Sequence, residues 1–467
     1  MGAMPITDQH LEYAAALPVW LRHRDVLRGE DAVKARGQVY LARLDGMSDE
    51  DYRAYVQRAC FFNATARTAA GMVGMIFRRD ARTSIDEKAI NLADVDLAGT
   101  SFTNYAKELV SEVVATGRCG TLVDWSDSEQ RPYLSLYSAE SILNWRTERI
   151  DGRTRLTLVV LSEPQYVTKA DGFGCETVET YRVLRLLPSG VHTVELWQRE
   201  PLGSKDGKFA VVATFEPKRA GKPLTEIPFI FHGPETCGPE VERSPLEDIV
   251  SVNLDHYRLD ADYKHGVHYT ALPTAWVCGF APNSEMIIGQ KTAWVSEQLG
   301  ASAGFLEFTG KGLTTFQVAQ EHDERLMAVL GARVLFSQKK VAESAEAMAM
   351  RMVGEDSILA TLARACSAGL TEALRWCVWW HDAGLASLAD VPPDRAKVDL
   401  NTDFTETGLG AKEIIAVVSA WQAGAISTEE MRDIFERGEL LTLTRTKTNA
   451  DCGLRNADLK PQPKNYA

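Results

Sequence analysis

Hydrophobic residues recur at helical spacing through the first third of the chain. Ser48 stands three residues before Asp51, as in a helix-capping box, and apolar side chains then follow every three or four residues. This pattern predicts one helix of about 25 residues that ends near Gly74. A second helix is predicted over 102–116, because the glycine at Gly117 follows its last apolar residue.

From Thr121 the period changes. Short runs rich in β-branched and aromatic residues are separated by Asp, Ser, Gly and Pro. We expect a mainly antiparallel β region whose strands include 121–125, 133–137, 156–160, 181–186, 194–197, 210–215 and 227–231.

The second half begins with a helix, a β-rich insert and another helix. Ser244 and Pro245 form a cap and a first-turn proline, and an apolar stripe then continues to about Leu272. At ~1.5 Å per residue this helix would be roughly 40 Å long. Short β-rich runs follow, and 315–335 then has helical spacing again.

A further helical pattern covers 344–380. It exceeds the usual length of a globular helix, so we expect a long kinked helix bent at Gly354 or Gly369. Two small helices follow, of which the second opens with a capping box at Ser427. The stretch from Thr444 has almost no apolar residues and a charge of +3, from five bases and two acids, so a mobile tail is expected.

Composition limits what the protein can bind. Of 467 residues 45% are hydrophobic and 25% charged, which is enough for a large core. The formal net charge of −13 argues against tight nucleic-acid binding over the whole surface, because phosphate affinity rests on clustered Lys and Arg. Any DNA contact must be local or loose. Apolar runs of membrane-spanning length and a signal peptide are lacking, so no membrane association is expected, and the protein should be cytosolic when made.

The cysteines show no pairing pattern. None belongs to a CxxC pair, so neither a disulfide framework nor a zinc knuckle is indicated, and we expect reduced, mostly buried thiols. They are Cys60, Cys119, Cys175, Cys237, Cys278, Cys366, Cys377 and Cys452.

One glycine-rich run invites comparison with a phosphate-binding loop. Five residues separate Gly304 from Gly310, where the phosphate-loop pattern has four. Gly312 follows Lys311, so the hydroxyl that would bind Mg²⁺ is missing. The run is more typical of a strand that ends in a tight turn.

The helix after Pro245 is dense in potential metal ligands. Asp255, Asp262 and His265 share a face, but Asp255 and His265 lie about 15 Å apart along the axis and cannot converge on one ion. Only His265 and His268, at i and i+3, could chelate. A solvated or interface face is favoured over a metal site, and neither catalytic residues nor a cofactor are indicated. A metal-dependent hydrolase using His265 and His268 remains the alternative from a different class.

The N-terminal region contains a distinctive series of short strings: Tyr40-Leu-Ala-Arg-Leu44, Asp51-Tyr-Arg-Ala-Tyr55, Arg58, Phe61-Phe-Asn-Ala-Thr65, Arg67-Thr68 and Gly71-Met-Val-Gly-Met-Ile-Phe-Arg78. This series resembles the start of one branch of the portal proteins of tailed bacteriophages. The order of the later elements also matches the portal plan.

The resemblance implies an α+β portal fold with a wing, a two-helix stem, a small α/β clip, a tunnel loop, a long kinked helix and a short helical crown. The implied regions are an N-terminal arm 1–30, the wing 31–243, the first stem helix 244–272, the clip 273–311, the second stem helix 312–335, the tunnel loop 336–346, the long wing helix 344–384, a wing strand 385–409, the crown 410–443 and the tail 444–467.

Portal proteins are rings, commonly of twelve subunits, at one capsid vertex. The resemblance therefore implies a homo-oligomeric ring, a dodecamer, that is assembled in the host cytoplasm and carried in the virion. Double-stranded DNA would pass through its channel during packaging, retention and ejection. The implied partners are the large terminase subunit, which is the packaging ATPase, a head–tail adaptor, and the major capsid and scaffolding proteins. Another ring or adaptor component of the virion is the nearer alternative.

The tunnel loop supplies the site residues that the resemblance implies. Lys339 and Lys340 would touch DNA phosphates, and Glu343 and Glu346 would limit that attraction. The whole set is Ser337, Gln338, Lys339, Lys340, Glu343 and Glu346.

Overall fold

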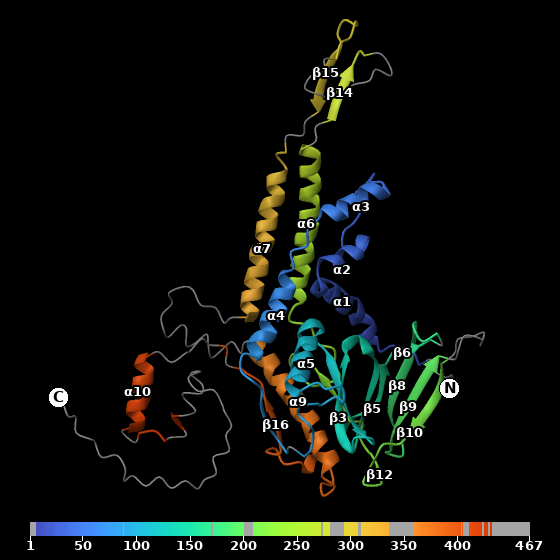
Figure 1. The fold of residues 1–467 in the computed structure, drawn as a ribbon, viewed down its shortest axis with the longest axis vertical. Coiled ribbons are helices and arrows are strands. Elements are labelled where there is room, and N and C mark those ends of the chain that lie inside the picture. Colours follow the sequence, from blue (N-terminus) through green and yellow to red (C-terminus); the bar gives the residue numbers. More distant parts are fainter. Residues whose placement is uncertain are drawn as a thin grey trace, which may run out of the picture. The chain divides into compact units, whose positions relative to one another are not determined.

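In the computed structural model the chain forms two compact units, Met1–Asp403 and Phe404–Ala467. The structure describes residues 6–86, 88–169, 171–199, 209–271, 274–280, 294–306, 310–335, 358–402, 404, 411–422, 425–427 and 430–431. Both secondary-structure types are abundant, and the fold class is α+β as the sequence predicts (Figure 1).

Four α-helices occupy the N-terminal region of the first unit: α1 (Leu11–Arg28), α2 (Glu30–Ala35), α3 (Asp49–Arg58) and α4 (Ala64–Ile76). The predicted capping box is present, with the backbone N–H of Asp51 donating to Ser48 Oγ at 3.1 Å. The first helix, α1, was not predicted; the segment was expected to be an arm. It buries Trp20 and Val26.

The single helix predicted after Ser48 is wrong, because α3 and α4 are separate. Between them the backbone N–H of Cys60 donates to the Asp260 carboxylate at 2.6 Å, a contact with a distant helix that continued α-helix would forbid. Asn63 then caps α4 by accepting from Ala66 N–H at 2.9 Å. Phe61 in the linker is buried and meets Tyr257 edge to face.

Two antiparallel sheets form the body of the unit. Helix α5 (Phe102–Thr116) ends at Gly117, whose φ of 75° is the left-handed conformation expected of a helix-terminating glycine. A three-stranded sheet has the order β13-β2-β3, and a five-stranded sheet has the order β10-β9-β8-β5-β4. Their strands are β2 (Cys119–Ser126), β3 (Arg131–Ser138), β4 (Ile142–Ile150), β5 (Arg153–Ser162), β8 (Thr180–Leu186), β9 (His192–Arg199), β10 (Phe209–Phe215) and β13 (Phe229–His232).

The antiparallel prediction is confirmed for these strands. Strand β4 was not predicted, because its polar residues obscure the alternation. Four short pairings complete the described sheet structure. They involve β1 (Arg82–Ile85) with β16 (Ala396–Asp399), β6 (Gln165–Thr168) with β7 (Cys175–Val178), β11 (Lys218–Arg219) with β12 (Lys222–Pro223), and β14 (Thr274–Cys278) with β15 (Ser302–Leu306).

Helix α9 (Ile358–His381) is the central helix of this body. It packs against β2, β3, β13 and β16, and Leu370 and Leu374 are fully buried. The helix continues through Gly369, where a bend was expected. A Cβ at that position would lie 2.2 Å from the ring of His232, so the glycine serves close packing against β13. The other expected bend, Gly354, lies outside the described residues.

The second unit contains α10 (Ala411–Gln422). The capping box predicted at Ser427 is present: Glu430 N–H donates to Ser427 Oγ at 3.1 Å, and Ser427 N–H donates to the Glu430 carboxylate at 2.7 Å. The expected tail 444–467 lies outside the described residues.

The thiols are less buried than expected. Cys119, Cys366 and Cys377 are buried, Cys237 is half-buried, and three others are exposed: Cys60, Cys175 and Cys278. All seven are unpaired, and Cys452 lies outside the described residues. Among the described helices, none combines the length and apolar character needed to cross a bilayer.

Candidate functional site: the α6–α7 helix pair

Two long helices pack against each other and form the most distinctive feature of the first unit. They are α6 (Glu247–Ala271) and α7 (Leu313–Leu335), and the β14–β15 hairpin is inserted between them in the chain (Figure 1). Their bounds lie within a few residues of those predicted from the hydrophobic stripe.

Helix α6 is anchored to the body at its N-terminal end. Ser244 Oγ accepts from Leu246 N–H at 3.0 Å and donates to the carbonyl of Val114 in α5 at 2.8 Å. About two turns further along, the fully buried amide of Asn253 bonds Thr65 Oγ1 at 2.9 Å and the carbonyl of Phe62 at 2.7 Å. Because these polar groups are satisfied only in this arrangement, the base of α6 is held in one position.

Side-chain contacts define the antiparallel register of the pair. Gln317 donates to the Tyr263 hydroxyl at 2.8 Å, and Gln320 donates to Asp260 at 3.4 Å. At Gly266 a Cβ would lie 2.6 Å from Leu313, so the helices approach closely there.

The proposed metal ligands of α6 have other partners. The hydroxyl of Tyr55 in α3 donates to Asp262, and Arg58 lies 3.4 Å from His265 Nδ1. Burial, followed by the charge of Arg58, lowers the pKa of His265. A guanidinium beside this imidazole would oppose a bound cation. His268 instead contacts Tyr269 edge to face.

Among the described residues no three His, Cys, Asp or Glu side chains converge on a point where a metal could bind. Two of the α6 side chains considered as metal ligands from the sequence, Asp262 and His265, instead attach α3 to α6, as an interface face would.

The hairpin between the helices exposes large apolar side chains. Trp276 pairs with Gly304 across the strands, and its indole lies over the glycine. Trp276 and Phe305 are about half exposed. Because they are exposed, these side chains are available to contact a partner. A two-stranded hairpin is only marginally stable by itself, so such a contact would also stabilise it.

The glycine-rich run is a strand followed by a turn into a helix. Gly304 lies in β15, and Gly310, with a φ of 63°, accepts from Leu313 N–H at 2.9 Å as α7 begins. Residues 307–309 lie outside the described residues.

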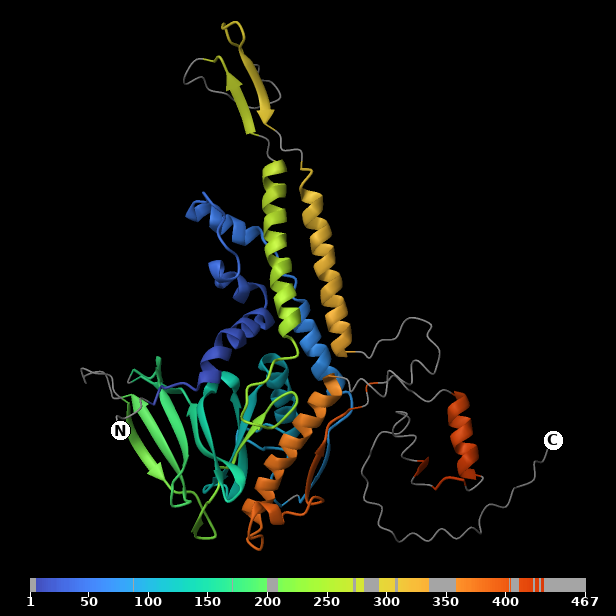
Figure 2. The ribbon, with the colours of Figure 1, turned by 180° about the vertical axis from the view of Figure 1, so that it is seen from behind.

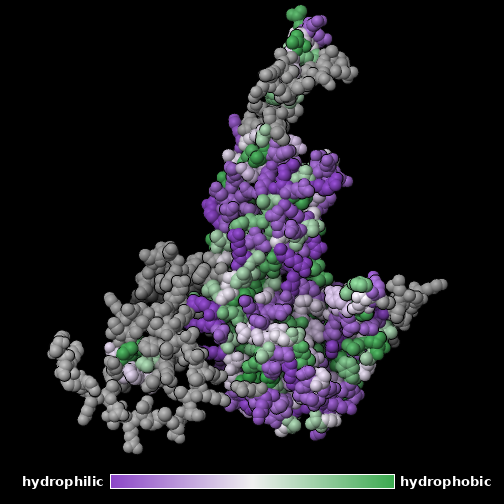
Figure 3. Space-filling model, viewed as in Figure 1, coloured by the Kyte–Doolittle hydropathy of each residue, from purple (hydrophilic) through white to green (hydrophobic). Residues whose placement is uncertain are grey.

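The pair is polar and acidic. Five acids and two bases in α6, with three acids and two bases in α7, give a net charge of −4. Figure 3 shows a mainly hydrophilic surface over these helices, with scattered apolar side chains. The six predicted tunnel-loop residues, Ser337, Gln338, Lys339, Lys340, Glu343 and Glu346, lie outside the described residues.

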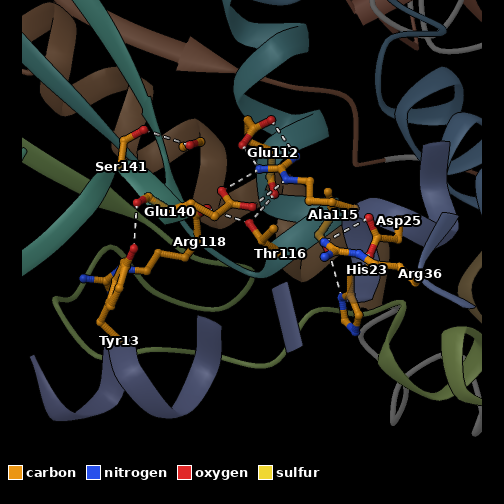
Figure 4. A network of polar contacts seen from close by, with 12 residues as sticks. Tyr13, His23, Asp25, Arg36, Glu112, Ala115, Thr116, Arg118, Glu140 and Ser141 are labelled. Atoms are coloured by element: carbon orange, nitrogen blue, oxygen red, sulfur yellow. Dashed lines mark hydrogen bonds and ion pairs between the residues drawn. The ribbon is translucent and has the colours of Figure 1, made fainter. Parts of the chain in front are cut away.

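Sequence reasoning missed the network that fixes α1 to α5 and to the turn before β4 (Figure 4). Arg24 donates to Glu112 of α5 at 2.9 Å and to Glu140, which precedes β4, at 2.8 Å. Hydrogen bonds from this guanidinium lower the pKa of Glu140 although burial opposes the shift. No local pattern signals the network, because its members are about 90 and 116 residues apart.

The described fold is thus an α+β body that carries a paired-helix extension. A family model described as "Domain of unknown function (DUF4055)" matches residues 245–381, which is less than a third of the chain and extends from α6 to α9. Comparison with curated proteins gives no match.

Several solved structures align with most of the chain. A chain from the neck of a native GTA particle, computed with C12 symmetry, is 10% identical, with a TM-score of 0.37, and covers 86% of this chain and 98% of that one. A chain from the neck of an empty GTA particle, computed with C6 symmetry, is 11% identical, with a TM-score of 0.38 and coverages of 87% and 98%. A chain from the virion of a native gene transfer agent (GTA) particle is 13% identical, with a TM-score of 0.37 and coverages of 88% and 99%.

Proposed function

We propose that this protein is a ring-forming virion component, and specifically the portal through which double-stranded DNA enters and leaves a phage-like capsid. The observation that carries the proposal is the α6–hairpin–α7 unit on an α+β body, followed by the buried helix α9. Together with the portal-like N-terminal string from Tyr40 to Arg78, this order supports a stem, a clip and a wing.

The charge of the helix pair supports passage of DNA. If α6 and α7 surround a pore, many copies of a stem with a net charge of −4 repel phosphate. DNA would slide along such a wall instead of adhering to it. Lys339 and Lys340 would provide local, screened attraction that a moving duplex can release.

In this proposal the protein is not an enzyme. Translocation is driven by a separate packaging ATPase, the large terminase subunit, and the exposed hairpin docks a head–tail adaptor. Its Trp276 and Phe305 have the aromatic character that is enriched at protein interfaces.

The assembly state is the first test. Native mass spectrometry and negative-stain images of the purified chain should show a ring of several hundred kilodaltons, not a 51.6 kDa monomer. A monomer that binds stoichiometric zinc would instead support the metal-dependent hydrolase.

A second experiment separates a portal from another ring or adaptor protein. In a complementation assay, loss of a portal leaves capsids without packaged DNA, whereas loss of an adaptor allows packaging but not tail joining. Lys339→Ala/Lys340→Ala should form normal rings yet retain packaged DNA less well, with the difference largest at low salt. Unchanged retention at every salt concentration would remove the lysines from the proposal.

A further inference from the structure

A groove lies on one side of α6, between α6, α1 and the segment after α2. Its volume is about 430 Å³. Three arginines, Arg22, Arg36 and Arg258, line it together with one carboxylate, Asp25, which leaves a net charge of +2. Leu21 and Val39 add an apolar rim, and Val39 is 70% exposed.

Arg36 and Arg258 are held in place by hydrogen bonds but remain partly exposed. Asp25 is buried and accepts from Arg36 at 2.6 Å and from the Tyr40 hydroxyl at 2.7 Å. Arg258 donates through Nε to the Tyr40 carbonyl at 2.8 Å, so its terminal nitrogens point away from that contact. Nearly half of the Arg36 and Arg258 side chains is exposed. Fixed cations beside exposed apolar groups suit an amphipathic partner that presents a carboxylate among apolar side chains.

Such a surface lies on α7. Its outward face exposes Val318, Leu326 and Val329, of which Val318 is 62% accessible. Between them Glu321 and Arg325 form a loose ion pair at 3.9 Å, and both side chains are about 70% exposed. Helix α7 lies on one side of α6, and α1 and α2 lie on the other (Figures 1 and 2). The groove is on the α1 side, because residues of α1 and of the segment after α2 line it.

The two surfaces lie at the same height along the helix pair. His256 of α6 is level with Glu324 of α7, at 3.6 Å, and Asp260 is level with Gln320. The groove residue Arg258, with Asp255 3.8 Å away, therefore lies level with Glu321 and Arg325. A pure rotation about an axis parallel to the helices moves no copy along that axis. Only surfaces at equal height along the axis can therefore meet between neighbouring copies.

We propose that the outward face of α7 in one copy docks into the arginine-lined groove of the next copy, with Glu321 on Arg258 and Arg325 on Asp255. The two surfaces lie on opposite sides of α6 and at equal height. Each copy can therefore bind the next copy head to tail, and the series of contacts can close into a ring. Val318, Leu326 and Val329 would cover the apolar rim at Leu21 and Val39. This inference rests on the proposed ring.

Charge reversal in the full-length chain tests the contact. Arg258→Glu and Glu321→Arg should each raise the concentration for half-assembly by about tenfold or more, as measured by mass photometry, because a like-charge pair then faces the interface. The double variant Arg258→Glu/Glu321→Arg exchanges the two charges, and it should recover most of the assembly lost by either single variant.

A matched control is provided by the exposed ion pair of Arg199 and Glu179, which are 3.7 Å apart. Arg199 lies on the five-stranded sheet, and Glu179 lies just before strand β8. Arg199→Glu should leave the half-assembly concentration unchanged. Circular dichroism and the Tm of each variant confirm that the monomer remains folded.

The outcomes separate the two proposals. Rings that form at parental concentrations in both single variants overturn the docking contact but leave the ring intact. Folded single variants that lose assembly and are not rescued in the double variant also overturn the pairing. A parental chain that stays monomeric at every concentration overturns the ring and, with it, the contact.

Discussion

Helices α7 and α9 have nearly the same length but opposite environments. Of the 24 residues of α9, 14 are buried, among sheet strands and other helices of its own chain. Helix α7 has 23 residues, and between Leu313 and Gly331 it buries only Asp323, Met327 and Gly331. Burial within one chain accounts for the apolar residues of α9 but leaves those on the outward face of α7 unexplained.

The contrast separates residues needed for folding from residues available for assembly. A helix that is apolar on most sides belongs in a core, whereas exposed valine and leucine side chains between charges on α7 suit a contact with another copy. We expect substitutions in α9 to affect the monomer, and substitutions on the outward face of α7 to affect only the oligomer.

The largest expected difference comes from placing a carboxylate on each helix. Leu370→Asp buries an unpaired charge, which costs several kcal/mol and should prevent folding. Val318→Asp should change the free energy of unfolding of the monomer by less than about 0.5 kcal/mol, because the site is 62% exposed. Soluble yield and urea denaturation measure both effects. Normal folding of Leu370→Asp would show that the α9 face is accessible.

A second pair of variants compares arginines. Arg24→Met removes the cation shared by Glu112 and Glu140, and should lower the free energy of unfolding by about 2 kcal/mol, since these side chains are four-fifths buried. Arg325→Met removes an exposed partner and should change it by less than about 0.5 kcal/mol. Equal effects in denaturant titrations of the two monomers would contradict the comparison.

The pH dependence of stability should come from the body. Burial lowers the pKa of His192 to about 4 and that of His232 to about 3, whereas an unfolded histidine titrates near pH 6.5. Between pH 6.5 and about 4 the unfolded chain therefore binds more protons. Each histidine then removes up to about 1.4 kcal/mol of stability per pH unit as the pH falls.

The contribution of the two neutral, buried histidines to stability is fully present above pH 6.5. Urea denaturation at pH 7 and pH 5 should show the loss, and His192→Gln should reduce the dependence on pH. A stability that is the same at both pH values in the parental chain would mean that these histidines bind protons as readily in the folded state as in the unfolded chain.

The smallest expected effect on the body comes from removing the hairpin. Replacing residues 273–309 with a short Gly-Ser linker should shift the Tm of the body by no more than about 2 °C, because the two ends are close: a Cβ at Gly310 would lie 3.3 Å from the Thr270 side chain. Ring yield and adaptor binding should fall. A large decrease in Tm would show instead that the hairpin contributes to the stability of the body.

The sequence by itself determined the elements whose signals are local. Helix 102–116 and its stop at Gly117, the capping boxes at Ser48 and Ser427, and the start of α6 after Ser244 all depend on neighbouring residues. Most strands of the antiparallel region were predicted for the same reason, since alternation and turn residues act over a few positions.

Only the tertiary structure decided where those elements bend, end and meet. The helix is interrupted between α3 and α4 because the backbone N–H of Cys60 donates to Asp260, 200 residues away. Strand β4 forms despite its charges, because β5 supplies its backbone partners. The groove joins α1, Tyr40 and Arg258 across more than 200 residues. The register of α6 on α7 places this groove level with Glu321. Such juxtapositions depend on packing and on the satisfaction of buried polar groups, which have no local period in the sequence.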